Sequence, residues 1–194
     1  MKTKMYFNPH KVAYYEKAGW EAYYDRNWPR AFRLMVALNR EEFHMPLWTA
    51  LTGAMDIVRA SIAFAPLDKN DMPKALGYLQ RYYEKAKRTV NIKTDAPTLA
   101  RLEMDYWVVH RELALERIKQ NDLENTGPMV DSLTNLHAAL FGISRESARR
   151  SAELRARAAQ AVDRITGRYS KDVNDDWMQV ESYLQQAYCA VISA

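Results

Sequence analysis

Residues 45–65 read MPLWTALTGAMDIVRASIAFA, the least polar stretch of the chain. The only charged residues in it are Asp56 and Arg59, and a proline stands near each end. A helix that is apolar on all sides is typically buried on all sides. The stretch therefore predicts a helix over residues 46–65 at the centre of the fold, enclosed by the other helices.

Proline, glycine and capping residues divide the rest of the chain into further helices. Proline suits the first turn of a helix, and a residue before proline leaves the helical region. Side chains such as Asp71 and Ser144 are typical N-caps. The expected helices cover about 10–27, 29–44, 46–65, 71–91, a fifth from its cap at Asp95 or Thr94 to the break at Asn125, a sixth ending at Gly142, a seventh from Ser144 to Gly167 and an eighth from about Asn174.

No stretch alternates between apolar and polar residues as a half-buried strand does. The sequence therefore predicts an all-α fold, a single compact domain over residues 1–194. About eight helices would pack around the buried helix at 46–65.

Cysteine usage and the N-terminal residues bear on where the protein is found. The chain of 194 residues has one cysteine, Cys189, which cannot form an internal disulfide. That usage is typical of a reducing compartment. The first residues also lack the apolar run of a signal peptide. We therefore expect a cytoplasmic protein, and the two charges within 45–65 argue against a membrane span.

The net charge of +4 comes from one arginine-rich segment, residues 145–168. Arg150, Arg157 and Arg164 recur every seven residues and so share a helix face, a pattern that phosphate-binding helices also show. However, two of the glutamates precede arginines by four residues, and the opposite face is rich in alanine. The pattern favours a solvated helix face over a nucleic-acid site or a site for an acidic protein.

The charged pair in the apolar stretch is the first candidate for a site. Asp56 and Arg59 are three residues apart and can pair on one helix face. One interpretation is a structural ion pair. The other is an arginine that Asp56 holds in place to bind a carboxylate or phosphate group.

The second interpretation leads to the favoured function. Tyr15, Trp48, Tyr106 and Trp107 would form the walls of a pocket between helices, in which Arg59 anchors a small, partly apolar anionic ligand. The sequence does not decide whether such a protein is an enzyme.

A metal site is the first alternative. Glu103 and His110 lie seven residues apart on one face, and His137 follows on the next helix. Carboxylates and imidazoles at such positions can ligate iron or manganese, as in metal-dependent oxidases and oxygenases of the di-iron kind. A half-buried histidine and a solvated glutamate fit the same spacing.

Assembly is the second alternative. Eight aromatic residues crowd the first 28 positions and occupy more than one face of the first helix. Tyrosine and tryptophan are typical of subunit interfaces because they combine a large apolar area with a polar tip. The cluster therefore also fits a homodimer without catalysis.

Overall fold

The computed structural model describes residues 5–120 and 126–194, and within them the chain forms eight helices and no β-strand. The predicted all-α fold class is confirmed. The helices are α1 (Pro9–Tyr24), α2 (Trp28–Glu42), α3 (Leu47–Phe64), α4 (Met72–Thr89), α5 (Ala96–Gln120), α6 (Gly127–Phe141), α7 (Arg145–Thr166) and α8 (Val173–Ile192).

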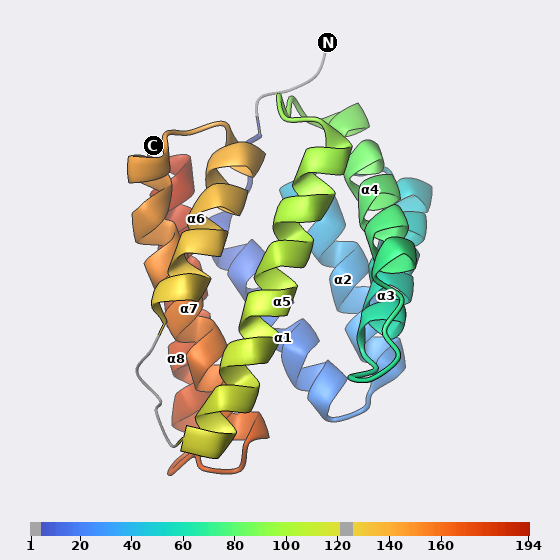
Figure 1. Ribbon diagram of the computed structural model, residues 1–194. Helices are drawn as coiled ribbons and strands as arrows, with labels where there is room; N and C mark the ends of the chain where they lie inside the picture. The colour runs from blue at the N-terminus through green and yellow to red at the C-terminus, as the bar shows by residue number, and fades with distance from the viewer. Residues whose placement is uncertain (1–4, 121–125) are drawn as a thin grey trace.

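The helices are arranged as a closed ring. Each one packs against the next helix in the chain, and α8 packs against α1 as well as α7. In Figure 1, α6, α7 and α8 stand on the left and α2, α3 and α4 on the right, with α5 in front and α1 behind them. The ring gives several helices an inner face that can reach the same interior space.

Capping residues set the helix ends close to the expected positions. The side chains of Asp71, Ser144 and Asp172 accept hydrogen bonds from backbone N–H groups at the starts of α4, α7 and α8. Gly142 ends α6 in the left-handed region at φ 67°, which glycine adopts without steric cost. The first helix ends earlier than expected, because Asn27 caps α2 by accepting from the Arg30 N–H at 3.2 Å. The expected break at Asn125 lies outside the described residues.

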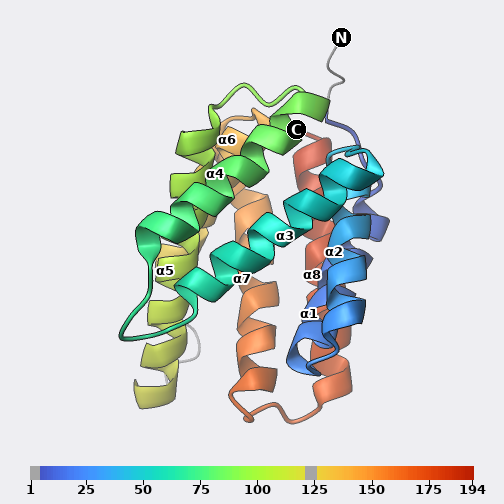
Figure 2. The same cartoon turned by 90° about the vertical axis from the view of Figure 1, so that its right-hand side faces the viewer.

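The expectation that the helix at 46–65 is enclosed by the others is wrong. Figure 2 shows α3 and α4 lying across the outside of the molecule, and the main contacts of α3 are with α2 and α4. Trp48 is 79% exposed and Ile62 is 66% exposed. The helix buries its small residues instead, among them Ala50, Gly53 and Ala54. The apolar residues of this stretch do not reveal which side of the helix is buried, because the buried side carries mostly small residues and the exposed side carries large ones.

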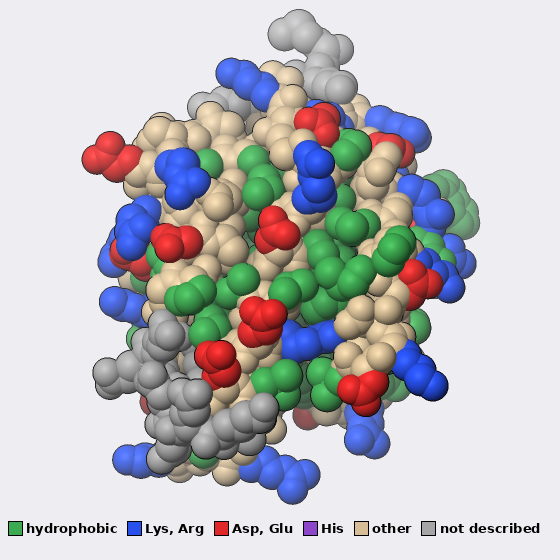
Figure 3. Space-filling model, in the orientation of Figure 1, with side chains coloured by type: hydrophobic (Ala, Val, Ile, Leu, Met, Phe, Trp, Pro, Cys, Tyr) green, Lys and Arg blue, Asp and Glu red, His purple; other side chains and the backbone are tan. Residues whose placement is uncertain are grey.

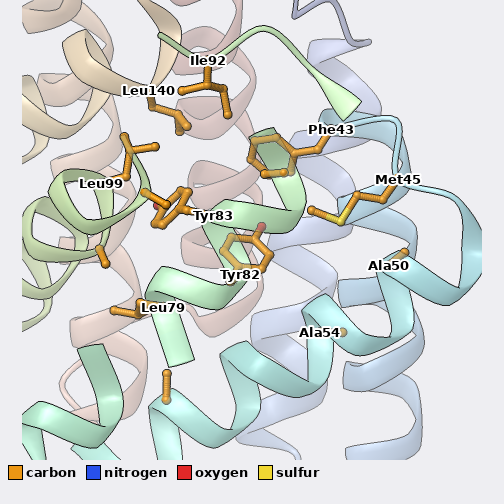
Figure 4. Packing of buried hydrophobic residues seen from close by; sticks show 14 of the residues in the cluster. Phe43, Met45, Ala50, Ala54, Leu79, Tyr82, Tyr83, Ile92, Leu99 and Leu140 are labelled. Carbon is orange, nitrogen blue, oxygen red and sulfur yellow. The ribbon is translucent and has the colours of Figure 1, made fainter. Parts of the chain in front are cut away.

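The largest hydrophobic cluster lies where α3 and α4 meet the rest of the ring. Figure 4 shows Tyr82 of α4 on the side toward α3, which carries the small Ala50 and Ala54, and Leu79 farther along the same cluster. The cluster continues through Leu99 and Leu140, so it joins α3 and α4 to α5 and α6. It fixes the position of α4, which carries two tyrosines of the site described below.

In the part of the chain that the structure describes, no helix combines the length and the apolarity that crossing a bilayer requires.

Candidate functional site

A cavity of about 620 Å³ occupies the interior of the helix ring. We call it the central cavity. Side chains from α1 to α8 line it, and most of these are aromatic or aliphatic. Its exposed lining residues, Tyr23, Tyr24 and Thr166, lie at the ends of α1 and α7. The opening is therefore at the end of the ring where the α1–α2 and α7–α8 turns lie (Figure 1).

Part of the predicted pocket wall is present in the central cavity. Tyr15, Tyr106 and Trp107 line it, as the sequence led us to expect. Trp48 does not, since it is on the outer side of α3 and largely exposed.

The outer surface near α5 is mixed in character. In the view of Figure 3, hydrophobic side chains gather beside α5, and acidic side chains follow the outer face of this helix.

Asp56 and Arg59 lie outside the central cavity, in a separate surface depression that Arg81 and Lys85 of α4 also line. Asp56 is buried and accepts from Arg81 Nη2 at 3.1 Å and from Lys85 Nζ. Arg59 is exposed. The predicted pairing of Asp56 with Arg59 is thus replaced by pairing with the neighbouring helix, which a pattern along one helix does not reveal.

An ion pair between α7 and α1 lies in the wall of the central cavity. Arg155 Nη1 and Nη2 donate to the two carboxylate oxygens of Glu16 at 2.9 and 2.5 Å. The Tyr188 hydroxyl donates to the same carboxylate at 2.5 Å. Two parallel bonds of this kind hold a guanidinium and a carboxylate in a fixed geometry. Arg155 therefore has its charge matched by Glu16.

A second carboxyl, that of Glu103, is held by uncharged donors. It accepts from the Tyr83 hydroxyl at 2.9 Å and from Trp107 Nε1 at 2.8 Å. Burial raises the pKa of Glu103, although Arg155 and the two hydrogen bonds act in the opposite direction. No basic side chain of the described residues forms an ion pair with it.

The third carboxyl, that of Glu42, has the fewest stabilising contacts. Glu42 is 6% exposed and lines the central cavity. No group in the described residues donates a hydrogen bond to it. Burial, together with repulsion from Glu16 and Glu103, raises the pKa of Glu42 to about 8 against the opposing effect of Arg155. The carboxyl is thus mainly protonated at neutral pH. We call Glu16, Glu42 and Glu103 the carboxyl cluster.

The residues of the predicted metal site line the central cavity but have different partners. His110 Nε2 is 3.1 Å from Asp163 Oδ1, and its ring stacks on Tyr106. His137 Nδ1 is 3.0 Å from the Ser151 hydroxyl. Burial lowers the pKa of His137 to about 3, so it is neutral. Glu103, His110 and His137 are not brought together, and residues 5–116 and 126–194 hold no group of three or more potential ligands.

Sequence reasoning missed the residues that carry the most unusual chemistry, namely Arg155, Glu16 and Glu42. A signal for Arg155 was present, because it stands three residues after Ala152 and four before Ala159, both buried in α7. An arginine in the middle of a buried alanine face needs a buried partner. Two of the three arginines on the predicted solvated face are exposed: Arg150 has a side chain that is 60% exposed, and Arg157 is exposed. The expectation is wrong for Arg164, whose side chain is 27% exposed and donates from Nε to Asp176 Oδ1 of α8 at 3.0 Å.

Comparison with protein-family models, curated proteins and solved structures finds no match to this chain. The functional argument therefore depends on the central cavity itself.

Proposed function

We propose that the protein binds a small, partly apolar molecule in the central cavity. The observation that carries this proposal is a helix ring that encloses about 620 Å³, within the usual range of ligand pockets. Its wall is mainly aromatic and aliphatic, with a small number of polar groups at fixed positions. That combination is typical of sites for small molecules.

The hollow interior supports the proposal. Protein interiors are normally close-packed, whereas the interior of this helix ring is hollow and opens at one end. Filling this space would need only a few larger side chains at positions such as Gly19, Ala31, Ala114 and Ala159, which all line it. Retained space and buried, unpaired Glu42 are both features of a site that accepts a ligand.

The sequence analysis expected Arg59 to bind an anionic group of the ligand, and the position of Arg59 does not allow this role in the central cavity. Arg59 lines the surface depression on α3, and Arg155 inside the ring is already matched by Glu16. The proposal therefore keeps an interhelical pocket with Tyr15, Tyr106 and Trp107 in its wall and gives up the anionic anchor.

The two other hypotheses have weaker support. An iron- or manganese-dependent oxidase would need Glu103, His110 and His137 to share an ion, and each has another partner. A homodimer through the N-terminal aromatic residues stays a prediction. Tyr14 and Trp28 are 48% and 54% exposed, which suits an interface but also an unpartnered surface.

The experiment uses three one-ring compounds that differ in charge: tert-butylbenzene, benzoate and phenyltrimethylammonium. Binding is measured by ligand-observed NMR and by calorimetry with the full chain. The variant Ala114→Phe places a large side chain in the cavity wall. It is compared with Leu115→Phe at the adjacent position, where the native side chain is exposed and does not line the cavity.

We expect at least one compound to bind the native protein and the Leu115→Phe variant, and to bind Ala114→Phe at least about tenfold more weakly, a difference of about 1.4 kcal/mol. If none of the three binds, or if both variants bind equally well, the proposal is wrong.

A further inference from the structure

We infer that the ligand of the central cavity carries a cationic group, an ammonium, and that Glu42 is its counter-ion. This inference rests on the proposed function and specifies the chemical class of the molecule. It is argued from the balance of charges inside the ring, from the aromatic wall and from the lack of a partner for Glu42.

The charged groups in the cavity leave two carboxyls without a basic partner. Glu16 is paired with Arg155, and Asp163 lies beside His110. Glu103 is held by a tyrosine and a tryptophan, and Glu42 by no donor of the described residues. Ionising a buried carboxyl without a counter-ion is costly, which is why Glu42 holds its proton. A bound cation would supply the missing counter-ion and allow Glu42 to ionise.

The remaining basic residue of the wall, Arg111, does not offset this excess. Its guanidinium lies 3.5 Å from the centre of the Phe64 ring, and its Nη2 donates to the Phe64 carbonyl at 2.6 Å. Phe64 ends α3, near the opening. Arg111 is therefore engaged at the edge of the cavity and is not directed at the carboxyl cluster.

The aromatic wall suits the same class of ligand. Rings of tryptophan and tyrosine attract cations through their faces, and several rings around one site are the usual way to bind a quaternary ammonium. Trp20, Trp107, Tyr15 and Tyr106 line the central cavity from α1 and α5. The Trp20 ring already lies 5.9 Å from the Arg155 guanidinium carbon, so part of this wall is in use for a cation.

Glu42 would couple binding to a proton. The charged groups that shift the pKa of Glu42 are Glu16 of α1, Glu103 of α5 and Arg155 of α7. Glu42 in turn raises the pKa of Tyr82 of α4. A cation beside Glu42 favours the ionised carboxylate and lowers its pKa. Because the pKa of Glu42 is about 8 without ligand, binding near pH 7 releases a proton, and affinity rises with pH up to about 8 and then levels.

The test compares phenyltrimethylammonium with tert-butylbenzene, which has the same shape and no charge. Calorimetry at pH 7 in two buffers of different ionisation enthalpy measures the protons released on binding. Titrations between pH 6 and pH 9 measure the affinity. The variants are Glu42→Gln, which has no ionisable group, and Glu41→Gln, which changes the adjacent residue. The Glu41 carboxylate accepts from the Asn8 N–H at 3.2 Å and does not line the central cavity.

We expect the cation to bind at least about tenfold more tightly than tert-butylbenzene at pH 8.5, with close to one proton released at pH 7. Glu42→Gln should lose most of this preference and the proton release, and Glu41→Gln should keep both. Proton release is measured on the native chain, so the inference is testable even if Glu42→Gln folds poorly.

The outcomes separate the two proposals. If tert-butylbenzene or benzoate binds as tightly as the cation, the cavity still binds small molecules and the cationic ligand is wrong. If the cation binds without releasing a proton, Glu42 is not its counter-ion. If no compound binds, the proposed function fails, and this inference fails with it.

Discussion

Arg155 and Glu16 are 139 positions apart in the chain, and their side chains form a two-pronged ion pair inside the helix ring. The Tyr188 hydroxyl shares the carboxylate of Glu16, so one polar contact joins α7, α1 and α8. These are the helices that close the ring. The pair thus has two consequences, since it joins the first helix of the ring to α7 and neutralises Arg155, which faces the carboxyl cluster.

Replacing Arg155 should therefore destabilise the protein strongly. Arg155→Met leaves the buried Glu16 carboxylate without its counter-ion, and the loss of one partner of a buried pair costs roughly 3–5 kcal/mol. Urea unfolding followed by circular dichroism measures the change. Arg157→Met, two residues along on the exposed side of α7, should change the free energy of unfolding by no more than about 0.5 kcal/mol.

The double variant Arg155→Met/Glu16→Gln distinguishes a lost ion pair from lost packing. Removing both charges should recover a large part of the stability that the single variant loses. A single-variant loss below about 1 kcal/mol, the range of exposed pairs, would show that this contact is open to water.

The sequence predicted the elements of this fold much better than their arrangement. Helix ends depend on caps and prolines within a few residues, and Asp71, Ser144 and Gly142 were identified in those roles. The closure of α8 onto α1 depends on contacts between distant segments. The burial of residues 45–65 was overestimated because apolar composition does not say which side of a helix its neighbours cover.

The same limit applies to the candidate site, whose role in ligand binding stays a prediction. Tyr15, Tyr106 and Trp107 line the central cavity. Their positions could be predicted because large aromatic residues on the inward face of a helix are recognisable from their spacing. The partner of Asp56 was assigned wrongly because the side chains that pair with it, Arg81 and Lys85, come 25 and 29 residues later in the chain, on another helix. Arg155 was not singled out from its arginine-rich segment, although its place among buried alanines distinguishes it.

The corrected pairing of Asp56 makes opposite predictions for two cations. Lys85→Met removes one of the two partners of a buried carboxylate and should cost roughly 1–3 kcal/mol, the usual cost of removing a hydrogen-bond partner from a buried polar group. Arg59→Met changes an exposed residue and should alter the free energy of unfolding by no more than about 0.5 kcal/mol. Equal losses in the two variants, measured by urea unfolding, would restore Arg59 as a partner of Asp56.

His137 should make the protein sensitive to acid. Its pKa is lowered from 6.5 to about 3 by burial and by Arg155, so the unfolded chain binds a proton that the folded chain does not. Its contribution to stability is complete above about pH 6.5 and is lost as pH falls towards 3, at up to about 1.4 kcal/mol per pH unit.

The measurement compares the native chain with His137→Gln, which keeps an acceptor for Ser151. The free energy of unfolding of the variant relative to the native chain should rise steadily from pH 6 to pH 4. A constant difference over this range would contradict a neutral, buried His137.

Glu42 should act in the opposite direction, at higher pH. Its pKa is raised from 4.5 to about 8, so the folded chain holds a proton that the unfolded chain has released. The contribution is favourable below about pH 4.5 and is lost as pH rises through 8. Between pH 4.5 and pH 6.5 it offsets the effect of His137. Above pH 6.5 it acts without that offset, so stability should fall by about 2 kcal/mol between pH 6.5 and pH 8.

Glu42→Gln removes this proton and should flatten that decline. The variant is then more stable than the native chain at pH 8.5, and the advantage shrinks as the pH is lowered to 6. The control Glu41→Gln should follow the native curve. If saturating phenyltrimethylammonium is added, the native decline above pH 6.5 should also disappear, because the bound cation holds Glu42 ionised in the folded state and affinity grows with pH over the same interval. A native curve that stays flat from pH 6.5 to pH 8.5 without ligand would show that the Glu42 carboxyl is already ionised at neutral pH, and it would remove the proton that links binding to pH.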